Sequence, residues 1–210
     1  MSDDAQDPPR STLDTPNEAP KDATRHGWLN GQLLIAMPQM GDARFEKALV
    51  FVCAHDAKGA MGLIVNKAIP DLTLATLLDE LLIDHDSDVF GDFPVLVGGP
   101  VETTRGFLLH SGEFNGRDTI RVRDDYAVTG TIEALRAAMG KGGPQDKMFA
   151  LGYAGWGAGQ LEDEIRNNAW LVCDARRDLV FGHDQTGKWD KALAFIGINP
   201  ALFSGESGHA

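Results

Sequence analysis

An apolar segment of this chain runs directly into a glycine-rich stretch and then into a charged helix, over residues 151–171 (LGYAGWGAGQLEDEIRNNAWL). The order strand, glycine turn, helix is typical of a phosphate-binding loop, because glycine leaves backbone N–H groups accessible and a helix N-terminus attracts anions. Here, however, the predicted helix begins with Glu162, Asp163 and Glu164, whose carboxylates occupy the positive end of the helix dipole. The stretch therefore predicts an unusual backbone geometry and argues against a polyanionic ligand.

A dinucleotide-binding site is the strongest enzymatic alternative for this stretch. Gly155 and Gly157 follow a predicted strand and precede a predicted helix, and Asp174 ends the next strand about 20 residues on. The third glycine of the motif is replaced by Gln160, however, and the start of the helix is acidic. The chain also lacks the Gly-Lys-Ser/Thr of a P-loop. We therefore expect neither NAD nor ATP to bind, and the sequence indicates no other cofactor.

Composition indicates the class of protein. The 210 residues are 43% hydrophobic and 24% charged, with a formal net charge of −12, which is typical of a soluble globular protein with one sizeable core. An acidic field opposes nucleic acids and anionic lipids, since affinity for phosphates comes mainly from Lys and Arg. No apolar run approaches the roughly 18 residues of a membrane span, and no signal-peptide pattern is present. We expect a cytoplasmic protein that binds neither nucleic acid nor a membrane.

The two cysteines, Cys53 and Cys173, each lie in an apolar strand-like run. Free cysteine in such surroundings usually behaves as a small buried hydrophobic residue, so we interpret both as structural thiols. The sequence contains no CxxC pair and no Cys/His spacing typical of zinc ligands. It therefore gives no indication of a metal site.

Residues 1–26 differ in composition from the rest of the chain. They contain prolines at positions 8, 9, 16 and 20, and Leu13 is their one large aliphatic residue. Such a segment cannot bury enough apolar surface to offset the entropy of ordering it. We therefore predict a disordered acidic tail over residues 1–26, followed by a single folded domain over residues 27–210.

Hydrophobic periodicity predicts both strands and helices in this domain. Leucines spaced at i, i+3, i+4, i+7 and i+8 from Leu74 to Leu82 predict an amphipathic helix. Because most predicted strands come one after another before the helices, an α+β fold is favoured over a regular βαβ alternation. The predicted strands lie at 32–37, 48–55, 61–66, 94–97, 106–110, 119–122, 147–153 and 170–173, the second and third forming a β-hairpin, and the predicted helices lie at 72–83, 131–139, 160–168 and 189–196.

Five residues of the glycine-rich stretch are candidates for contact with a ligand or partner: Gly155, Trp156, Gly157, Gly159 and Gln160. We expect the glycines to hold backbone conformations that a Cβ atom would strain. Trp156 stands between two of them, and an indole in such a position either fills the core or presents a flat face for stacking. The sequence leaves both interpretations open.

Four polar residues are candidates to line a pocket: His55, Asn66, His110 and Glu113. No GxSxG nucleophile motif accompanies them, and neighbouring residues on a strand point to opposite faces, so a triad could form only from distant segments. We therefore assign no catalytic residues and interpret both histidines as strand-end residues bonded to backbone or water. The alternative hypothesis is an enzyme or small-molecule-binding protein with a pocket near His55, Glu113 and Trp156.

Several further blocks of residues occur in order along the chain. They are LLIAM (33–37), Phe45, His55, GAMGLIVNK (59–67), VGGPV (97–101), GFLLH (106–110), GYAGWGAGQLEDEI (152–165), NAWL (168–171) and the closing GHA (208–210). Together they resemble the AlgH/YqgE-like family of bacterial proteins. The two longest blocks make chance a poor explanation for the match.

This resemblance implies a compact α+β domain in which a bifurcated, partly barrel-like mixed β-sheet is flanked by helices. No enzymatic activity is established for the family, so no catalytic residues can be transferred from it. The family name reflects a genetic link to the regulation of exopolysaccharide production, which implies a regulatory role with a link to transcription. We therefore expect a non-enzymatic protein that acts through contacts with a protein partner or a small ligand. The acidic tail departs from family members that begin near the first strand.

Overall fold

The computed structural model of the chain describes residues 28–86, 90, 92–116, 119–123, 125–131, 136 and 142–203. The predicted tail over residues 1–26 and the GHA block at 208–210 lie outside the described residues. So does the predicted helix at 131–139, apart from Thr131 and Arg136.

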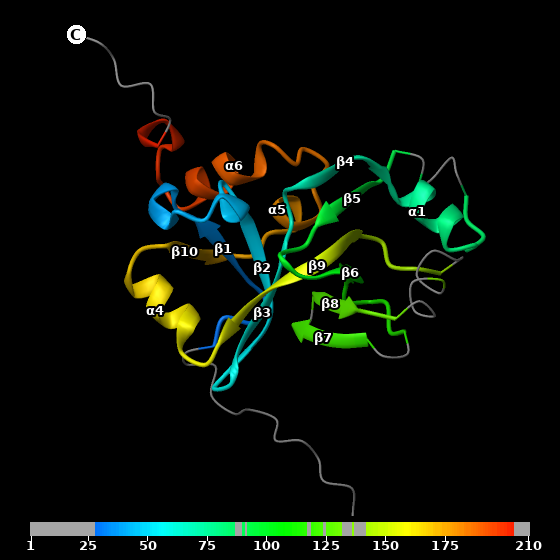
Figure 1. Cartoon of the computed structure of the whole chain (residues 1–210), viewed down its shortest axis with the longest axis horizontal. Helices are drawn as coiled ribbons and strands as arrows, with labels where there is room; N and C mark the ends of the chain where they lie inside the picture. Colours follow the sequence, from blue (N-terminus) through cyan, green and yellow to red (C-terminus); the bar gives the residue numbers. More distant parts are fainter. Residues whose placement is uncertain are drawn as a thin grey trace, which may run out of the picture.

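A mixed β-sheet forms the centre of the molecule (Figure 1). Its strands are β1 (Gln32–Ala36), β2 (Leu49–Asp56), β3 (Gly59–Ile64), β4 (Ala68–Thr73), β5 (Pro94–Val97), β6 (Val101–Ser111), β7 (Thr119–Arg123), β8 (Tyr126–Thr129), β9 (Lys147–Gly157) and β10 (Trp170–Asp174). They pair in the order β10-β1-β2-β3-β9-β6-β8-β7, with β5 joining β4 to β9. Strands β5 and β9 are parallel, and the other pairings are antiparallel. The sheet curls into a half-barrel.

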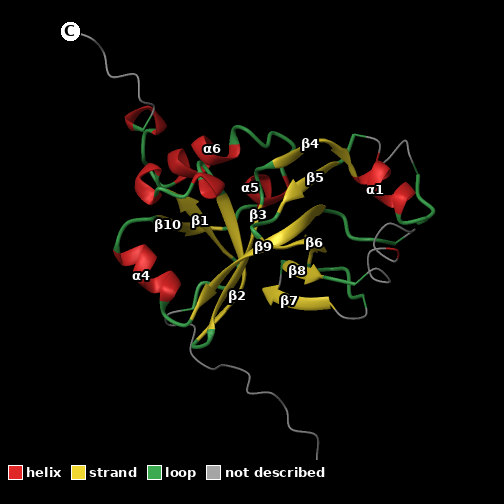
Figure 2. Cartoon of the chain, viewed as in Figure 1, coloured by secondary structure: helices red, strands yellow, loops and turns green. Residues whose placement is uncertain are grey.

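Helices lie around this sheet, as Figure 2 shows. The described residues contain the α-helices α1 (Leu74–Glu80), α4 (Gln160–Arg166), α5 (Arg177–Phe181) and α6 (Lys188–Phe195), and the 3-10 helices η1 (Pro38–Met40), η2 (Ala43–Phe45) and η3 (Pro200–Leu202). Helices α4 and α1 lie at opposite ends of the molecule's long axis (Figure 2), whereas α6 packs on α5, β1 and β2. The α+β class predicted from the sequence is confirmed.

The sheet divides into two branches along β9. The end of β9 pairs with β3, with Trp156 opposite Ala60, whereas its beginning pairs on the same side with β5, with Phe149 opposite Val95. Between the two lies Gly152, whose φ of +73° is left-handed and whose Cβ, if present, would lie 2.5 Å from a backbone oxygen of Gly99. Only glycine tolerates both conditions. The bifurcated sheet implied by the family resemblance is therefore confirmed, and a glycine stands at the point of division.

Both faces of the first three strands are buried. Leu33 and Phe51 belong to the main core cluster together with Leu193 of α6, whereas Leu34 belongs to a second cluster with Trp170. Successive side chains of a strand point to opposite faces, so covering both faces requires uninterrupted apolar runs. This explains the unbroken runs LLIA and LVFV in the sequence.

The glycine-rich stretch differs from its prediction. The strand expected to end at residue 153 continues to Gly157, so Gly155 and Gly157 lie in β9 rather than in a loop. Neither has a positive φ, and a Cβ at Gly157 would meet only Gln160 Oε1, at 3.8 Å. The prediction of strained backbone is therefore wrong at these two positions. It is confirmed at Gly159, whose φ is +75° and which caps α4.

Candidate functional site

A pocket of about 370 Å³ lies where the end of β9 meets α4. We refer to it as the β9–α4 pocket. The segment containing η1 and η2 forms one wall and the beginning of β6 a second, and the end of β9, helix α4 and the beginning of β10 form the remainder. Its lining residues are Met40, Asp42, Arg44, Phe45, Pro100, Val101, Gly155, Trp156, Gln160, Glu164, Ala169 and Trp170.

A single carboxylate, that of Glu164, organises the inner side of this pocket. Its Oε2 accepts hydrogen bonds from the indole Nε1 of Trp156 at 2.9 Å and of Trp170 at 2.7 Å. Its Oε1 accepts from the side-chain amide of Gln160 at 2.9 Å, one helical turn earlier on the same face of α4. The two indoles pack edge to face at 5.8 Å. The carboxylate is thus held in place by three neutral donors.

The facing wall carries an ion pair between Asp42 and Arg44. The guanidinium spans both carboxylate oxygens, with Nη2 at 2.7 Å from Oδ2 and Nε at 3.0 Å from Oδ1. The hydrogen bonds from Arg44 hold the pKa of Asp42 below its ordinary value. The segment is fixed to the sheet because Lys67 Nζ donates to the Arg44 carbonyl at 2.9 Å. The ring of Phe45 packs edge to face on Trp170, with centroids 5.5 Å apart.

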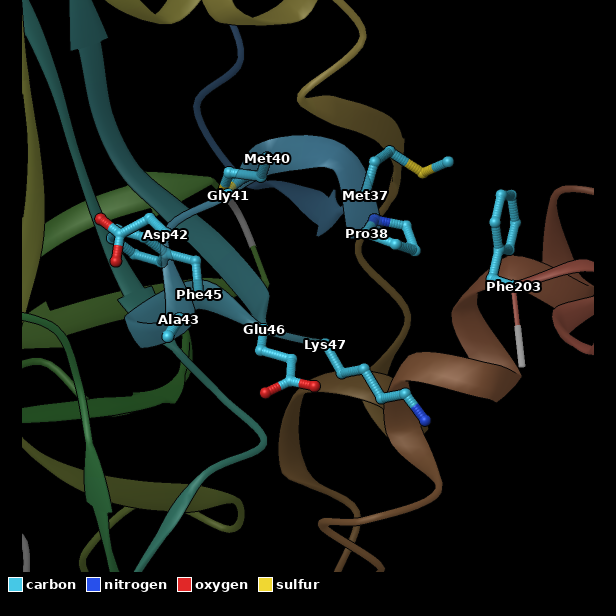
Figure 3. A pocket seen from close by; sticks show the side chains of 10 residues that line it. All are labelled: Met37, Pro38, Met40, Gly41, Asp42, Ala43, Phe45, Glu46, Lys47 and Phe203. Atoms are coloured by element: carbon cyan, nitrogen blue, oxygen red, sulfur yellow. The ribbon is translucent and has the colours of Figure 1, made fainter. Parts of the chain in front are cut away.

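A second pocket of about 290 Å³ lies on the other side of the same segment, and Figure 3 shows Phe203 facing Pro38 and Met37 across it. The two pockets share Met40, Asp42 and Phe45. The segment with η1 and η2 is therefore a thin wall between two cavities.

Strained backbone lies at the edges of these two pockets. Lys47, Glu102 and Asn168 all have positive φ angles, of 49°, 47° and 56°, although none is a glycine. Lys47 lines the second pocket, and the other two residues adjoin Val101 and Ala169 of the β9–α4 pocket. Such backbone is energetically unfavourable for Lys47 and Glu102 and is common at functional sites, whereas Asn168 follows the C-cap of α4, where asparagine often adopts it.

The predicted contact stretch is placed only in part at this pocket. Gly155, Trp156 and Gln160 line it, whereas Gly157 and Gly159 are not among its lining residues. Trp156 is only 7% exposed, so its indole fills the core rather than presenting a free stacking face. Gly155 is exposed, and a Cβ there would lie 3.3 Å from the ring of Tyr153. A side chain at Gly155 would therefore crowd Tyr153 and approach Val101 of the pocket wall.

His55 and Asn66 hold segments of the chain together. Leu29 N–H donates to His55 Nδ1 at 3.1 Å, so the other ring nitrogen carries the proton and donates to Glu162 Oε1 at 3.2 Å. Asn66 accepts from Leu49 N–H and donates to the Lys47 carbonyl, both at 2.8 Å. The hydrogen-bonding groups of both side chains are thus engaged within the fold.

His110 is similarly engaged. Its Nδ1 donates to the Ser111 carbonyl at 2.9 Å, and its Nε2 accepts from the hydroxyl of Thr129 at 3.0 Å. The side chain is fully buried, and burial lowers its pKa. The neutral imidazole is therefore favoured.

Glu113 lies in a separate polar cleft of about 670 Å³, which Arg121 and Arg177 also line. Its Oε1 accepts from the Ser111 hydroxyl and from Gln145 N–H, both at 2.7 Å. Burial opposes ionisation, but these hydrogen bonds outweigh it and lower the pKa of Glu113.

The alternative site near His55, Glu113 and Trp156 is not assembled. His55 and Trp156 flank Ala60 in the registers of β2, β3 and β9. Glu113, however, follows His110, which pairs with Lys147 at the opposite end of β9. At about 3.3 Å per residue, the strand places the two ends roughly 25 to 30 Å apart. Glu113 therefore does not share a pocket with His55 and Trp156.

Neither cysteine lies in a cavity described above. Both thiols are buried, and burial raises the pKa of Cys53 far above its ordinary value and that of Cys173 to about 11. Both are therefore protonated at neutral pH, as structural thiols should be. Among the described residues, no three His, Cys, Asp or Glu side chains are grouped to hold a metal ion, and no helix there is long and apolar enough to cross a bilayer.

Comparison with known proteins agrees with the fold. The AlgH-like family model matches residues 33–201. The UPF0301 protein of Methylobacterium sp. (strain 4-46) is 48% identical over 199 residues, covering 91% of this chain and 95% of that protein. A UPF0301 protein of Bradyrhizobium diazoefficiens is 45% identical over 208 residues, covering 96% of this chain and 97% of that protein.

Two solved structures are also similar. The solution structure of the AlgH protein from Pseudomonas aeruginosa has a TM-score of 0.72 and 34% identity, covering 90% of this chain and 100% of that chain. A crystal structure of a Corynebacterium diphtheriae protein has a TM-score of 0.65 at 17% identity, covering 80% of this chain and 86% of that chain, and shows likeness of fold alone. On the family match and the identities, this chain belongs to the AlgH-like family.

Proposed function

We propose that this protein is a non-enzymatic cytoplasmic regulator that binds a protein partner or a small ligand at the β9–α4 pocket. One observation carries the proposal: separate sequence blocks that mark the family come together at this pocket. They contribute Phe45, then Pro100 and Val101 from VGGPV, then Gly155, Trp156, Gln160 and Glu164 from GYAGWGAGQLEDEI, and finally Ala169 and Trp170 from NAWL.

Folding alone does not explain this convergence. Residues that serve only to fill a core are buried, and Trp156 and Trp170 meet that description. Gly155 and Gln160 are exposed, however. A set of buried and exposed residues around one hollow is typical of a binding site, in which apolar walls surround a few placed polar groups.

The chemistry of the pocket favours binding over catalysis. Its lining contains no hydroxyl, thiol, amine or imidazole side chain, so the usual nucleophiles and the commonest general base are missing from it. Of its carboxylates, Asp42 is paired with Arg44 and Glu164 accepts three hydrogen bonds. Both carboxylates are therefore held in fixed positions by their partners, which suits the binding of a ligand better than proton transfer or nucleophilic attack.

The proposal is tested by complementation of a deletion strain, with transcript levels as the readout. Gly155→Leu adds a side chain at the pocket wall, where its Cβ would lie 3.3 Å from the Tyr153 ring and 3.9 Å from Val101. Gly157→Leu adds the same side chain two residues further along β9, where the nearest atom to the Cβ is Gln160 Oε1 at 3.8 Å. We expect the wild type and Gly157→Leu to restore the transcript profile and Gly155→Leu to fail, with the two variants melting at similar temperatures.

Two results would contradict the proposal. If deletion of the gene leaves the transcript profile unchanged, the protein has no regulatory role. If Gly155→Leu restores the profile, the regulatory role does not depend on the pocket. Glu113→Gln tests the catalytic alternative in the separate polar cleft, and we expect this variant to restore the profile as well as the wild type does.

A further inference from the structure

We infer that the β9–α4 pocket binds a small organic cation, an ammonium or guanidinium group on an apolar body. The inference rests on the proposed function, whose site it characterises further. The charged side chains of the lining are Asp42, Arg44 and Glu164, and their sum is one negative charge. Because Arg44 already spans both oxygens of Asp42, the unbalanced charge is that of Glu164.

Glu164 is oriented without being neutralised. Its three donors are the indoles of Trp156 and Trp170 and the amide of Gln160, and all are uncharged. A carboxylate offers about four acceptor positions, so one position on Oε1 is left beside the Gln160 bond. The charge also lies against two buried indoles, where the local dielectric is lower than in water and its attraction for a cation is correspondingly stronger.

The remaining walls suit an apolar body. Met40, Phe45, Pro100 and Val101 contribute thioether, ring and aliphatic surface, and an aromatic face adds attraction for a cation placed over it. The volume of about 370 Å³ is within the range of small-molecule sites. An anion is disfavoured because Glu164 repels it and Arg44 is already paired with Asp42, and a bare metal ion finds only one carboxylate without a cationic partner. The matching ligand is a monocation with an apolar or aromatic portion.

Three probes of nearly equal size separate charge from shape: 2-phenylethylamine, 2-phenylethanol and phenylacetate. Binding is followed by NMR through the indole N–H signals of the full chain. Trp156 and Trp170 donate to Glu164, whereas Trp189 donates to the Ala36 carbonyl and serves as an internal reference. We expect the amine to shift the first two signals with saturation, at least tenfold more tightly than the alcohol, and phenylacetate to shift neither.

The matched variants are Glu164→Gln and Glu162→Gln. Both remove one negative charge from α4, and a glutamine oxygen can still accept from the indoles or from His55. Glu162 bonds to His55 and does not line the pocket. We expect Glu164→Gln to weaken amine binding at least tenfold and Glu162→Gln to change it less than twofold. Equal binding of amine and alcohol, tighter binding of phenylacetate, no binding of any probe, or unchanged affinity in Glu164→Gln would each overturn the inference.

Failure of this inference is distinguishable from failure of the proposed function. If Gly155→Leu abolishes complementation but the amine does not bind, the pocket acts on a ligand of another charge, and only the cation is refuted. If the amine binds through Glu164 but Gly155→Leu complements fully, the site binds cations without the regulatory role proposed for it.

Discussion

Trp156→Ala should destabilise the protein far more than Gly157→Val, although the two residues are adjacent on β9. The indole is 7% exposed, packs on Trp170 and donates to Glu164. At Gly157, by contrast, φ is not positive and a new Cβ has no neighbour closer than 3.8 Å. A sequence that places Trp156 between glycines does not indicate this ranking, whereas the structure does.

The size of the difference follows from these contacts. Truncation of a buried tryptophan to alanine costs about 3 to 5 kcal/mol, and a hydrogen-bond acceptor that loses a donor adds about 1 kcal/mol or more. We therefore expect the free energy of unfolding to fall by about 4 to 6 kcal/mol in Trp156→Ala. A glycine in an unstrained conformation is replaced with a change of about 1 kcal/mol at most, because the new side chain also restricts the unfolded chain.

Urea denaturation followed by circular dichroism measures both variants. Trp156→Phe keeps most of the packing while removing the Nε1 donor, and we expect it to lose about 1 to 3 kcal/mol. The stability of Trp156→Phe can still be measured if the loss caused by Trp156→Ala approaches the whole free energy of unfolding of the domain. A loss below about 1 kcal/mol in Trp156→Ala, or a larger loss in Gly157→Val than in Trp156→Ala, would refute the buried position of the indole.

Three further predictions concern residues that do not line the β9–α4 pocket. Burial lowers the pKa of Lys188 to about 7 from 10.5, so between these two pH values the unfolded chain holds a proton that the folded chain has lost. The difference in free energy of unfolding between the wild type and Lys188→Met should therefore rise with pH over this range, in favour of the wild type. A difference that stays constant in urea denaturation from pH 7 to 10 would contradict this. Gly59→Ala should lower the free energy of unfolding by at least about 2 kcal/mol, measured in the same assay, because φ is +138° and the Cβ would lie 2.2 Å from the Trp156 carbonyl. The thiols of Cys53 and Cys173 should resist a thiol reagent in the folded protein and react after denaturation; rapid labelling of the folded protein would show that one is accessible.

Elements with strong local signals were predictable from the sequence. The hairpin of β2 and β3 follows from two apolar runs around a short turn, and the structure places it as expected. Helix α1 follows from its leucine spacing, and in the structure the Thr73 hydroxyl caps it by accepting from Thr76 N–H at 3.3 Å. By contrast, β8 and α5 were not predicted. They have only 4 and 5 residues, which is too short to show the alternation of a strand or the repeat of an amphipathic helix.

The extent of β9 was not predictable, because it depends on a partner strand. Gly155 and Gly157 interrupt the apolar pattern and therefore resemble a loop. In the fold, however, they pair with Met61 and Gly59 of β3. Extended conformations are available to glycine, so the ladder continues through both residues. Pairing between distant strands overrides the local signal here.

The candidate site was predictable only where its residues are contiguous in sequence. Gly155, Trp156 and Gln160 were identified, but Glu164 and Trp170 were not. The spacing of Gln160 and Glu164 by one helical turn was a signal that both share a face of α4. The contribution of the segment around Asp42 had no such signal, because it reaches the pocket through tertiary contacts alone.

The division of the sheet and the existence of the pocket have one structural origin. Where β9 separates from β5, Gly99 approaches its backbone so closely that a Cβ would lie 2.1 Å from the carbonyl carbon of Tyr153. The two residues that follow, Pro100 and Val101, then form a wall of the β9–α4 pocket, with Val101 opposite Tyr153. A larger residue at position 99 would displace that wall without touching any ligand. The blocks VGGPV and GYAGWG therefore depend on each other physically, since the close approach of Gly99 to the backbone of Tyr153 brings Pro100 and Val101 to the same pocket that Trp156 lines.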